Sequence, residues 1–477
     1  MIHPWGKVHV VGVAGIGASS VARLMLLQGI PVSGSDLITS RRTQDLVQLG
    51  LQMHAGHNAA LVAAADTIVV SPRVPADNVE VLAARACGRP VMSLGAALAV
   101  LAEPFRCIAV SGSHGKTTIA SMLIRALRAL GQDPSFSIGG YPIGVDTNAH
   151  IGDQTLIVET NEADASFLHF RPDITVVTNV RPEPLPRYPA PDDLFAAFEQ
   201  HAGHIRPGGT LVAGPDEPAR RRLTPPPAAR LLRYGTEPCD DVQVTSVRRH
   251  REDTSFVLRH RHAEHPVSLP AIGVHTAENA AAAFAAGLAL DIPATPMAAA
   301  LGHYAGVHRR LETISKTTRV RIVDDYAIHP TAVEASITAA RTLPADRLIA
   351  VYVPLRINLV HAYAERLAEH LARADHVLVI DAPDATPADA TATGRMLAGV
   401  PAAHRWQAPD GRQAAQLLAR LATTGDLVLL MGDDRAHLIA VDLRNLLEQP
   451  STDPEAARPR RAQHAPHPAA AATGSRT

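Results

Sequence analysis

Residues 107–118 read Cys107-Ile-Ala-Val-Ser-Gly-Ser-His-Gly-Lys-Thr-Thr118 and combine an apolar run, a glycine-bearing turn and the start of a helical pattern. The apolar run at 107–110 predicts a buried strand, and a helix is expected from Lys116 onward. A strand, a turn and a helix N-terminus in this order direct backbone N–H groups at a phosphate. The predicted phosphate-binding residues are Gly112, Ser113, His114, Gly115, Lys116, Thr117 and Thr118.

The residue types in this loop suit a nucleoside triphosphate. Lys116 is expected to reach the outer phosphates, and the Thr117 hydroxyl to bind Mg²⁺. The general phosphate-loop pattern is met only in part, because Val110 stands where it has a glycine. Lysine is rare in this chain, at Lys7, Lys116 and Lys316, so a lysine after the second glycine favours a phosphate site. The alternative is an ordinary strand–turn–helix.

Composition limits the kind of protein this can be. A chain of 477 residues predicts about three domains. A net charge of −1 favours neither nucleic acid nor an anionic membrane. Three scattered cysteines fit a reducing compartment, and neither a signal peptide nor a membrane-length apolar run is recognised. We therefore expect a cytoplasmic protein without a nucleic-acid or membrane partner. A monomer or homodimer is the expected assembly.

The N-terminal sequence predicts a Rossmann-like unit. A strand from Lys7 leads into the glycine-rich turn 12–20, a helix follows to Leu27, and a second strand at 30–33 precedes Gly34-Ser-Asp36. A glycine-rich turn before a helix, with an acid after the next strand, is typical of nucleotide-binding units. A nicotinamide site, a UDP site and a bare turn all fit this pattern. The predicted ligand-binding residues are Gly15, Ile16, Gly17, Ser35 and Asp36.

Two further groups of polar residues follow the phosphate loop in the sequence. A predicted strand at 155–158 ends in Glu159-Thr-Asn-Glu162-Ala-Asp164, where carboxylates beside a triphosphate would hold Mg²⁺. His275 and Asn279 lie four residues apart on one face of a predicted helix. A solvated acidic loop is the alternative for the first group, and helix capping with packing is the alternative for the second.

The alternation of strands and helices predicts an α/β protein with mostly parallel sheets. The expected domains are a Rossmann-like domain at 1–104, a central ATP-binding domain of the P-loop ATPase type at 105–311, and a Rossmann-like C-terminal domain at 312–448. Residues 449–477 are rich in Pro, Ala and Arg without apolar periodicity, so a disordered tail is expected there.

Four blocks of sequence, in order, resemble the Mur ligase family across about residues 7–448, and most of all its muramate–alanine branch. The first is the glycine-rich turn with Ser33-Gly-Ser-Asp36, and the second is Ser113-His-Gly-Lys-Thr-Thr118. The third is the acidic segment 159–167. The fourth is Asp324-Asp-Tyr-Ala-Ile-His-Pro330. Members of this family use ATP to phosphorylate a substrate carboxylate, and an amino acid then attacks the acyl phosphate. The resemblance implies ATP, Mg²⁺, a UDP-sugar acid or related carboxylate, and an amino acid as ligands.

The resemblance also implies residue roles. Lys116, Glu162, His329 and Arg356 would be catalytic, and Thr117 and Glu162 would bind Mg²⁺. The nucleotide would contact the phosphate loop, and the additional nucleotide-binding residues would be His275, Asn279, Arg310 and Asp325. The N-terminal turn would bind the UDP moiety, and closure of the third domain would complete the site.

The chain departs from the family pattern at several positions. Pro184 stands where the family has a metal-binding histidine, and Ala327 and Ile328 replace a glycine and a histidine. Arg356 is retained in a substrate block whose second arginine is Leu359. We therefore expect an amide ligase with altered substrate positions. The ordinary muramate–alanine ligase, a non-catalytic ATP-binding relative and, from the N-terminal turn alone, a nicotinamide oxidoreductase are the alternatives.

Overall fold

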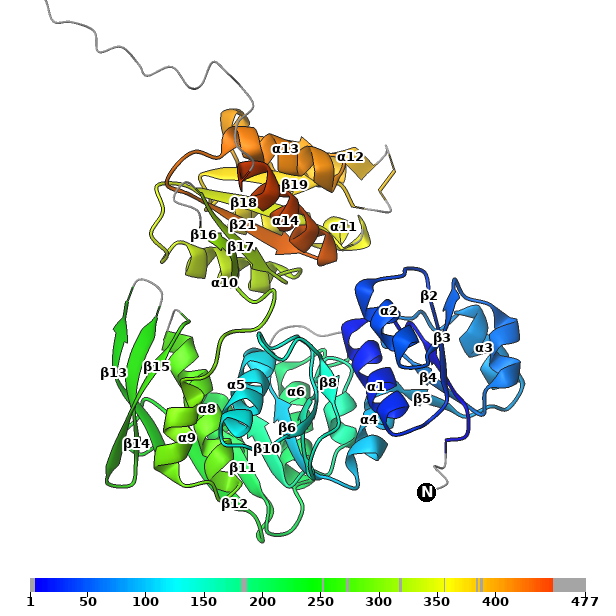
Figure 1. The fold of residues 1–477 in the computed structure, drawn as a ribbon, viewed down its shortest axis with the longest axis vertical. Helices are drawn as coiled ribbons and strands as arrows, with labels where there is room; N and C mark the ends of the chain where they lie inside the picture. The colour runs from blue at the N-terminus through cyan, green and yellow to red at the C-terminus, as the bar shows by residue number, and fades with distance from the viewer. Residues whose placement is uncertain are drawn as a thin grey trace, which may run out of the picture. The chain divides into compact units, whose positions relative to one another are not determined.

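The fold was obtained as a computed structural model, which describes residues 5–181, 187–250, 253–271, 274–316, 320–355, 357–382, 385–386 and 389–448. The chain forms two compact units. One comprises Met1–Glu312 and Asp324–Asp346, and the other comprises Thr313–Val323 and the chain from Arg347 onward. Three sheets with flanking helices confirm the predicted α/β class (Figure 1).

The first sheet is entirely parallel, with strand order β3-β2-β1-β4-β5. Its strands are β1 (Val8–Val11), β2 (Val32–Asp36), β3 (Gln52–Ala55), β4 (Thr67–Val70) and β5 (Val91–Ser93). Its helices are α1 (Ile16–Leu27), α2 (Arg41–Gln48), η1 (Ala59–Ala64), α3 (Val79–Ala86) and α4 (Leu94–Ala102). This is the Rossmann-like arrangement that the N-terminal pattern predicts.

The central sheet has the order β15-β14-β13-β12-β11-β10-β6-β9-β7-β8. Its strands are β6 (Arg106–Ser111), β7 (Ser135–Ser137), β8 (Ala149–His150), β9 (Thr155–Glu159), β10 (Ile174–Val177), β11 (Thr210–Ala213), β12 (Arg230–Gly235), β13 (Val242–Arg249), β14 (Thr254–His260) and β15 (Ala263–Leu269). Strands β6, β9, β10, β11 and β12 are parallel, whereas β13, β14 and β15 form an antiparallel meander.

Helices cover both faces of the central sheet: α5 (Lys116–Ala129), η2 (Ser166–His169), α6 (Pro191–Gly203), α7 (Glu217–Arg222), α8 (Val274–Ala289) and α9 (Ala294–Leu301). Ile108 and Val110 of β6 join the core under α5, α8 and α9, and Cys107 and Ala109 join the core with the N-terminal domain. A strand buried on both faces reads as a continuous apolar run, which is why 107–110 lacks alternation.

The third sheet has the order β16-β17-β21-β18-β19-β20. Its strands are β16 (Glu312–Lys316), β17 (Val320–Asp325), β18 (Leu348–Val353), β19 (His376–Ile380), β20 (Arg405–Ala408) and β21 (Asp426–Gly432). The helices in this part of the chain are α10 (Pro330–Ala340), α11 (Ile357–Leu371), α12 (Ala390–Arg395), η4 (Ala402–His404), α13 (Gly411–Leu421) and α14 (Asp434–Glu448). The predicted domain limits stay predictions, and the tail at 449–477 lies outside the described residues.

Candidate functional site

The predicted phosphate loop connects β6 to α5 at the carboxyl edge of the central sheet. Helix α5 begins at Lys116, and Gly115 before it has a left-handed φ of 86°. Gly112 also has a positive φ, 123°, and a Cβ there would lie 2.9 Å from the backbone oxygen of Asn179. Both glycines therefore occupy positions that an L side chain would strain. The loop geometry agrees with that predicted from the sequence.

The ends of the neighbouring strands bring the acidic segment to this loop, because β6 pairs with β9 on one side and with β10 on the other. The Lys116 ammonium donates to both oxygens of Glu162, at 3.0 and 3.3 Å, and to the Gly112 carbonyl. The Thr117 hydroxyl donates to Glu159 Oε2 at 2.8 Å. The predicted cation, hydroxyl and carboxylate thus converge within one small region.

Glu159 is a site residue to which the sequence pattern gave no separate role. Its Oε2 accepts hydrogen bonds from the Thr117 hydroxyl and, at 2.7 Å, from the Gly139 amide. Its position at the carboxyl end of a buried strand could have indicated this role in the sequence. The family resemblance, however, pointed to Glu162 in the same segment. Two carboxylates, not one, therefore face the first turn of α5.

The chain after β10 holds the other side of the loop. Asn179 accepts from the His114 amide through Oδ1, at 3.1 Å, and from the Ser113 amide through its own carbonyl, at 2.9 Å. The Thr178 hydroxyl donates to the His114 carbonyl at 2.7 Å, and the Arg181 amide donates to the Ser113 hydroxyl at 2.9 Å. These bonds occupy the backbone amides of Ser113 and His114 and fix the shape of the turn. Pro184 lies outside the described residues.

A polar pocket of about 250 Å³ adjoins the segment after β10 that holds the phosphate loop. It is lined by Thr178, Asn179, Arg181, Pro215, Asp216, Glu217, Tyr234, Glu278 and Asn279. Asn279 Oδ1 is also the atom that a Cβ on Gly115 would approach, at 2.7 Å. Asn279 therefore connects the phosphate loop to the pocket. His275, one turn earlier on α8, has an exposed side chain.

The predicted N-terminal residues also form a compact loop. Gly15 is the N-cap residue of α1, and Ile16 and Gly17 are the first two residues of this helix. Asp36 accepts from the Ala14 amide at 2.9 Å, so its carboxylate closes the glycine-rich turn. The Ser35 hydroxyl is buried and donates to Glu80 at 2.6 Å, and its side chain therefore points into the domain.

Direct contacts link the start of α1 to the segments beside β7 and β8 in the central part of the chain. Asn148, next to β8, donates to the Ile16 carbonyl at 2.9 Å and lies 3.1 Å from the Ser19 hydroxyl. The hydroxyls of Ser20 and Ser137 are 2.9 Å apart. The chain from Ser137 then leads to Gly139, which donates to Glu159. The chain from β7 to Gly139 thus connects the start of α1 to the acidic segment beside the phosphate loop.

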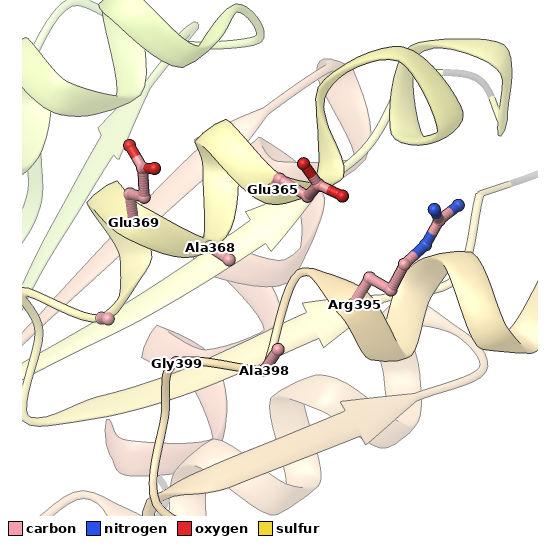
Figure 2. Close-up of a pocket in the computed structure, with 7 residues that line it drawn as sticks. Glu365, Ala368, Glu369, Arg395, Ala398 and Gly399 are labelled. Atoms are coloured by element: carbon pink, nitrogen blue, oxygen red, sulfur yellow. The ribbon is translucent and has the colours of Figure 1, made fainter.

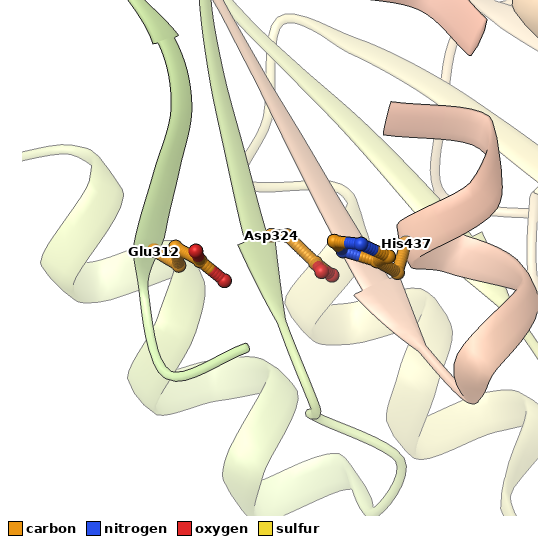
Figure 3. A group of neighbouring side chains, drawn as sticks. All are labelled: Glu312, Asp324 and His437. Atoms are coloured by element: carbon orange, nitrogen blue, oxygen red, sulfur yellow. The ribbon is translucent and has the colours of Figure 1, made fainter. Parts of the chain in front are cut away.

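The predicted block at 324–330 forms the end of β17 and the start of α10. Figure 3 shows Glu312 on β16 and Asp324 on β17. Asp324 accepts from the Arg309 guanidinium at 3.2 Å. Burial raises the pKa of Asp325, although Arg310 and a hydrogen bond from the Ser336 hydroxyl oppose this effect. His329 is the N-cap residue of α10, and Arg356 lies outside the described residues.

A second pocket, of about 390 Å³, lies within the compact unit that contains the chain from Arg347 onward. It is lined by Glu365, Ala368, Glu369, Ala372, Arg395, Ala398 and Gly399. Figure 2 shows that Glu365, Ala368 and Glu369 come from one wall and Arg395, Ala398 and Gly399 from the opposite one. None of these residues was predicted to form the site. Within the described residues, no helix is long and apolar enough to cross a bilayer.

The fold and the site define an α/β enzyme class that combines a glycine-rich binding turn with a phosphate loop and strand-end carboxylates. Three family models match consecutive parts of the chain: "Mur ligase family, catalytic domain" at residues 7–106, "Mur ligase middle domain" at 110–287, and "Mur ligase, glutamate ligase domain" at 309–433. The chain belongs to the Mur ligase family.

Individual relatives support the same assignment. The chain is 37% identical over 456 residues to the UDP-N-acetylmuramate–L-alanine ligase of Kineococcus radiotolerans, covering 93% of this chain and 97% of that protein. It is 37% identical over 437 residues to the ligase of the same name from Streptomyces griseus, covering 89% and 93%. The crystal structure of UDP-N-acetylmuramate–alanine ligase from Thermotoga maritima matches with a TM-score of 0.77 at 22% identity, covering 92% and 98%. The resemblance to this family and its muramate–alanine branch is therefore confirmed.

Proposed function

We propose that this chain joins L-alanine to the carboxylate of UDP-N-acetylmuramate and converts ATP to ADP and phosphate. The observation that carries the proposal is the convergence of Lys116, Thr117, Glu159 and Glu162 at the phosphate loop. The relatives named UDP-N-acetylmuramate–L-alanine ligase supply the substrate identities.

The reaction has two steps in which all atoms are accounted for. A carboxylate oxygen of the sugar acid attacks the γ-phosphorus of ATP, a P–O bond forms, and the bond to the β-phosphate oxygen breaks to release ADP. The alanine amine then attacks the acyl carbon, and the tetrahedral intermediate loses a proton from nitrogen and expels phosphate. The amide keeps one oxygen of the original carboxylate, and the phosphate takes the other.

The described residues suit the charge changes in these steps. The Lys116 ammonium would neutralise negative charge on the transferred phosphoryl group. Because Asn179 accepts from the Ser113 and His114 amides, the backbone amides at the N-terminus of α5 would contact the phosphates instead. Lys116 already balances Glu162 across 3.0 Å, with both side chains largely buried. A low-dielectric setting strengthens such interactions.

The residues at the loop also fit magnesium. Glu159, Glu162 and the Thr117 hydroxyl offer oxygen donors, which are the ligands that Mg²⁺ prefers. When bound, the ion would neutralise charge on the phosphates. Thr117 and Glu162 are the metal ligands expected from the family, and Glu159 is added from the geometry.

The pocket that Asn279 joins to the phosphate loop is proposed to take the adenosine part of ATP. Its mixed amide, carboxylate and phenol lining suits a base with both donors and acceptors. His275, Arg310 and Asp325 keep their predicted nucleotide-side roles, and His329 and Arg356 their predicted catalytic roles. Gly15, Ile16, Gly17 and Asp36 are proposed to bind the UDP part, whereas Ser35, whose buried hydroxyl donates to Glu80, would support the turn from inside the domain.

The substrates also suggest where the enzyme works. ATP and UDP-sugars are cytoplasmic metabolites, and the three cysteines are unpaired in the structure, as expected in a reducing compartment. We therefore propose a cytoplasmic role in peptidoglycan synthesis.

An assay that omits one substrate at a time tests this function. Purified protein with Mg²⁺, ATP, UDP-N-acetylmuramate and L-alanine should release phosphate and form the amide, detected by mass. Leaving out either organic substrate should remove both signals. ATP binding without turnover in the complete mixture would contradict the proposal and favour a non-catalytic relative.

A further inference from the structure

A buried histidine lies directly beneath the phosphate loop. His201 on α6 is fully buried, and its Nε2 is 3.0 Å from the Ser111 hydroxyl. That hydroxyl is in turn 2.7 Å from the Thr160 hydroxyl. Both distances are those of hydrogen bonds. One imidazole thus forms a polar chain with the last residue of β6 and the first residue after β9.

This chain joins the two segments that carry the site. Ser111 immediately precedes Gly112, whose carbonyl accepts from Lys116. Thr160 immediately follows Glu159, which accepts from Thr117, and lies two residues before Glu162. A shift of either hydroxyl would therefore move one member of the Lys116–Glu162 pair relative to the other.

The surroundings of His201 hold its side chain in one position and keep the imidazole from exchanging protons. Its ring packs against Phe167 with centroids 4.9 Å apart. Burial lowers the pKa of His201 to about 3, so the imidazole is neutral at working pH. Side chains held in a dry, packed setting have few alternative rotamers.

We propose that His201 is a positioning residue for the phosphoryl-transfer site, setting the separation of the phosphate loop from the acidic segment through Ser111 and Thr160. This inference rests on the proposed function, because it assumes that the loop holds ATP. A misplacement of reacting groups by about 1 Å costs about 100-fold in rate.

The test compares variants that keep or remove the hydrogen-bonding atom. His201→Leu removes it, whereas His201→Gln keeps an amide at the reach of Nε2. The Leu variant should lose about 10- to 100-fold in kcat, with KM for L-alanine little changed, and the Gln variant should recover most of this loss. His204→Leu, at the C-cap of the same helix, is the matched control and should keep the wild-type kcat.

A double-mutant cycle separates positioning from general stability. The losses in kcat of Ser111→Ala and His201→Leu should combine less than multiplicatively in the double variant, because both variants remove the same His201–Ser111 hydrogen bond. Wild-type kcat in His201→Leu, or losses that multiply in the double variant, would overturn the proposal. If His201→Leu does not fold, Ser111→Ala and Thr160→Val decide, and full kcat in both would overturn it. Failure of the wild type to turn over ATP would instead contradict the proposed function.

Discussion

At the scale of single residues, the site consists of charged and hydroxyl side chains with mutual partners. Lys116 pairs with Glu162, and Thr117 donates to Glu159. These are the groups that an ATP-dependent ligase needs for charge neutralisation and metal binding. Composition made Lys116 conspicuous in the sequence, since the chain has only three lysines.

Replacing Lys116 by Met should lower kcat by about 1,000-fold, since the charge that stabilises the transferred phosphoryl group is lost. Steady-state phosphate release measures this. Lys7→Met is the matched control, because Lys7 is exposed and lies in the N-terminal domain. Equal activity of the Lys116 variant and the wild type would show that the loop does not carry the chemistry.

Glu80 makes stability depend on pH. Burial raises the pKa of Glu80, but His9, the Ser35 hydroxyl and the Asn58 amide outweigh this and lower it to about 2 from 4.5. A carboxyl group whose pKa is lower in the folded than in the unfolded state stabilises the fold at pH values above its unfolded-state pKa. This stability is lost as the pH falls through the folded-state pKa. The N-terminal domain should therefore lose about 3 kcal/mol between pH 5 and about 2.

Thermal unfolding of the wild type and of Glu80→Gln across this range checks the prediction. The Gln variant should be less stable at pH 6, and the difference should shrink towards pH 2. A gap between the two proteins that stays constant with pH would contradict the assigned role of Glu80.

At the scale of elements, much of the fold follows from sequence patterns. The helix expected from Lys116 onward begins at that residue, and the strand expected at 155–158 is Thr155–Glu159. The second strand was expected at 30–33 but is Val32–Asp36. Gly34 lies inside the strand, and glycine suits this position because a Cβ would come within 2.9 Å of the Val13 side chain. Close packing partners of this kind are invisible in a single sequence.

Gly112, directly after β6, lies in the strand-to-helix turn that forms the phosphate loop. Gly112→Ala should abolish phosphate release, because its φ of 123° is strained for alanine and its Cβ would meet the Asn179 backbone. Gly131→Ala is the matched control, since Gly131 also has a positive φ, 81°, but no atom lies within 4 Å of a Cβ there.

Both variants should lose about 1 kcal/mol of stability from backbone strain, and Gly112→Ala should lose more because its Cβ would also meet the Asn179 backbone, both measured by thermal unfolding. Only the Gly112 variant should also lose turnover. Parallel loss of activity in both would mean that strain alone, and not the loop's fit to Asn179, limits function.

At the scale of the whole molecule, the site depends on contacts between distant segments. Asn148 reaches Ile16 across 132 positions, and His201 reaches Ser111 across 90. The four sequence blocks indicated the family because each is local. The long-range hydrogen bonds between these blocks could not be predicted. No periodicity or motif in the sequence indicates which buried amide or imidazole will contact a given loop.

Replacing Asn148 by Leu should raise KM for UDP-N-acetylmuramate several-fold and leave KM for ATP nearly unchanged. Asn148 fixes the glycine-rich turn proposed to bind UDP, and a buried donor removed from a carbonyl costs about 1–3 kcal/mol. Initial rates with each substrate varied in turn measure both constants. A rise confined to KM for ATP would contradict this arrangement of the two binding loops.

The most direct test of the central claim follows an oxygen atom from one substrate into one product. UDP-N-acetylmuramate carrying heavy oxygen in its carboxylate is incubated with the protein, ATP, Mg²⁺ and L-alanine, and the released phosphate is analysed by mass. Transfer of a phosphoryl group to the carboxylate predicts that each phosphate carries one heavy oxygen. Unlabelled phosphate would show that ATP is hydrolysed by water and would contradict the ligase mechanism.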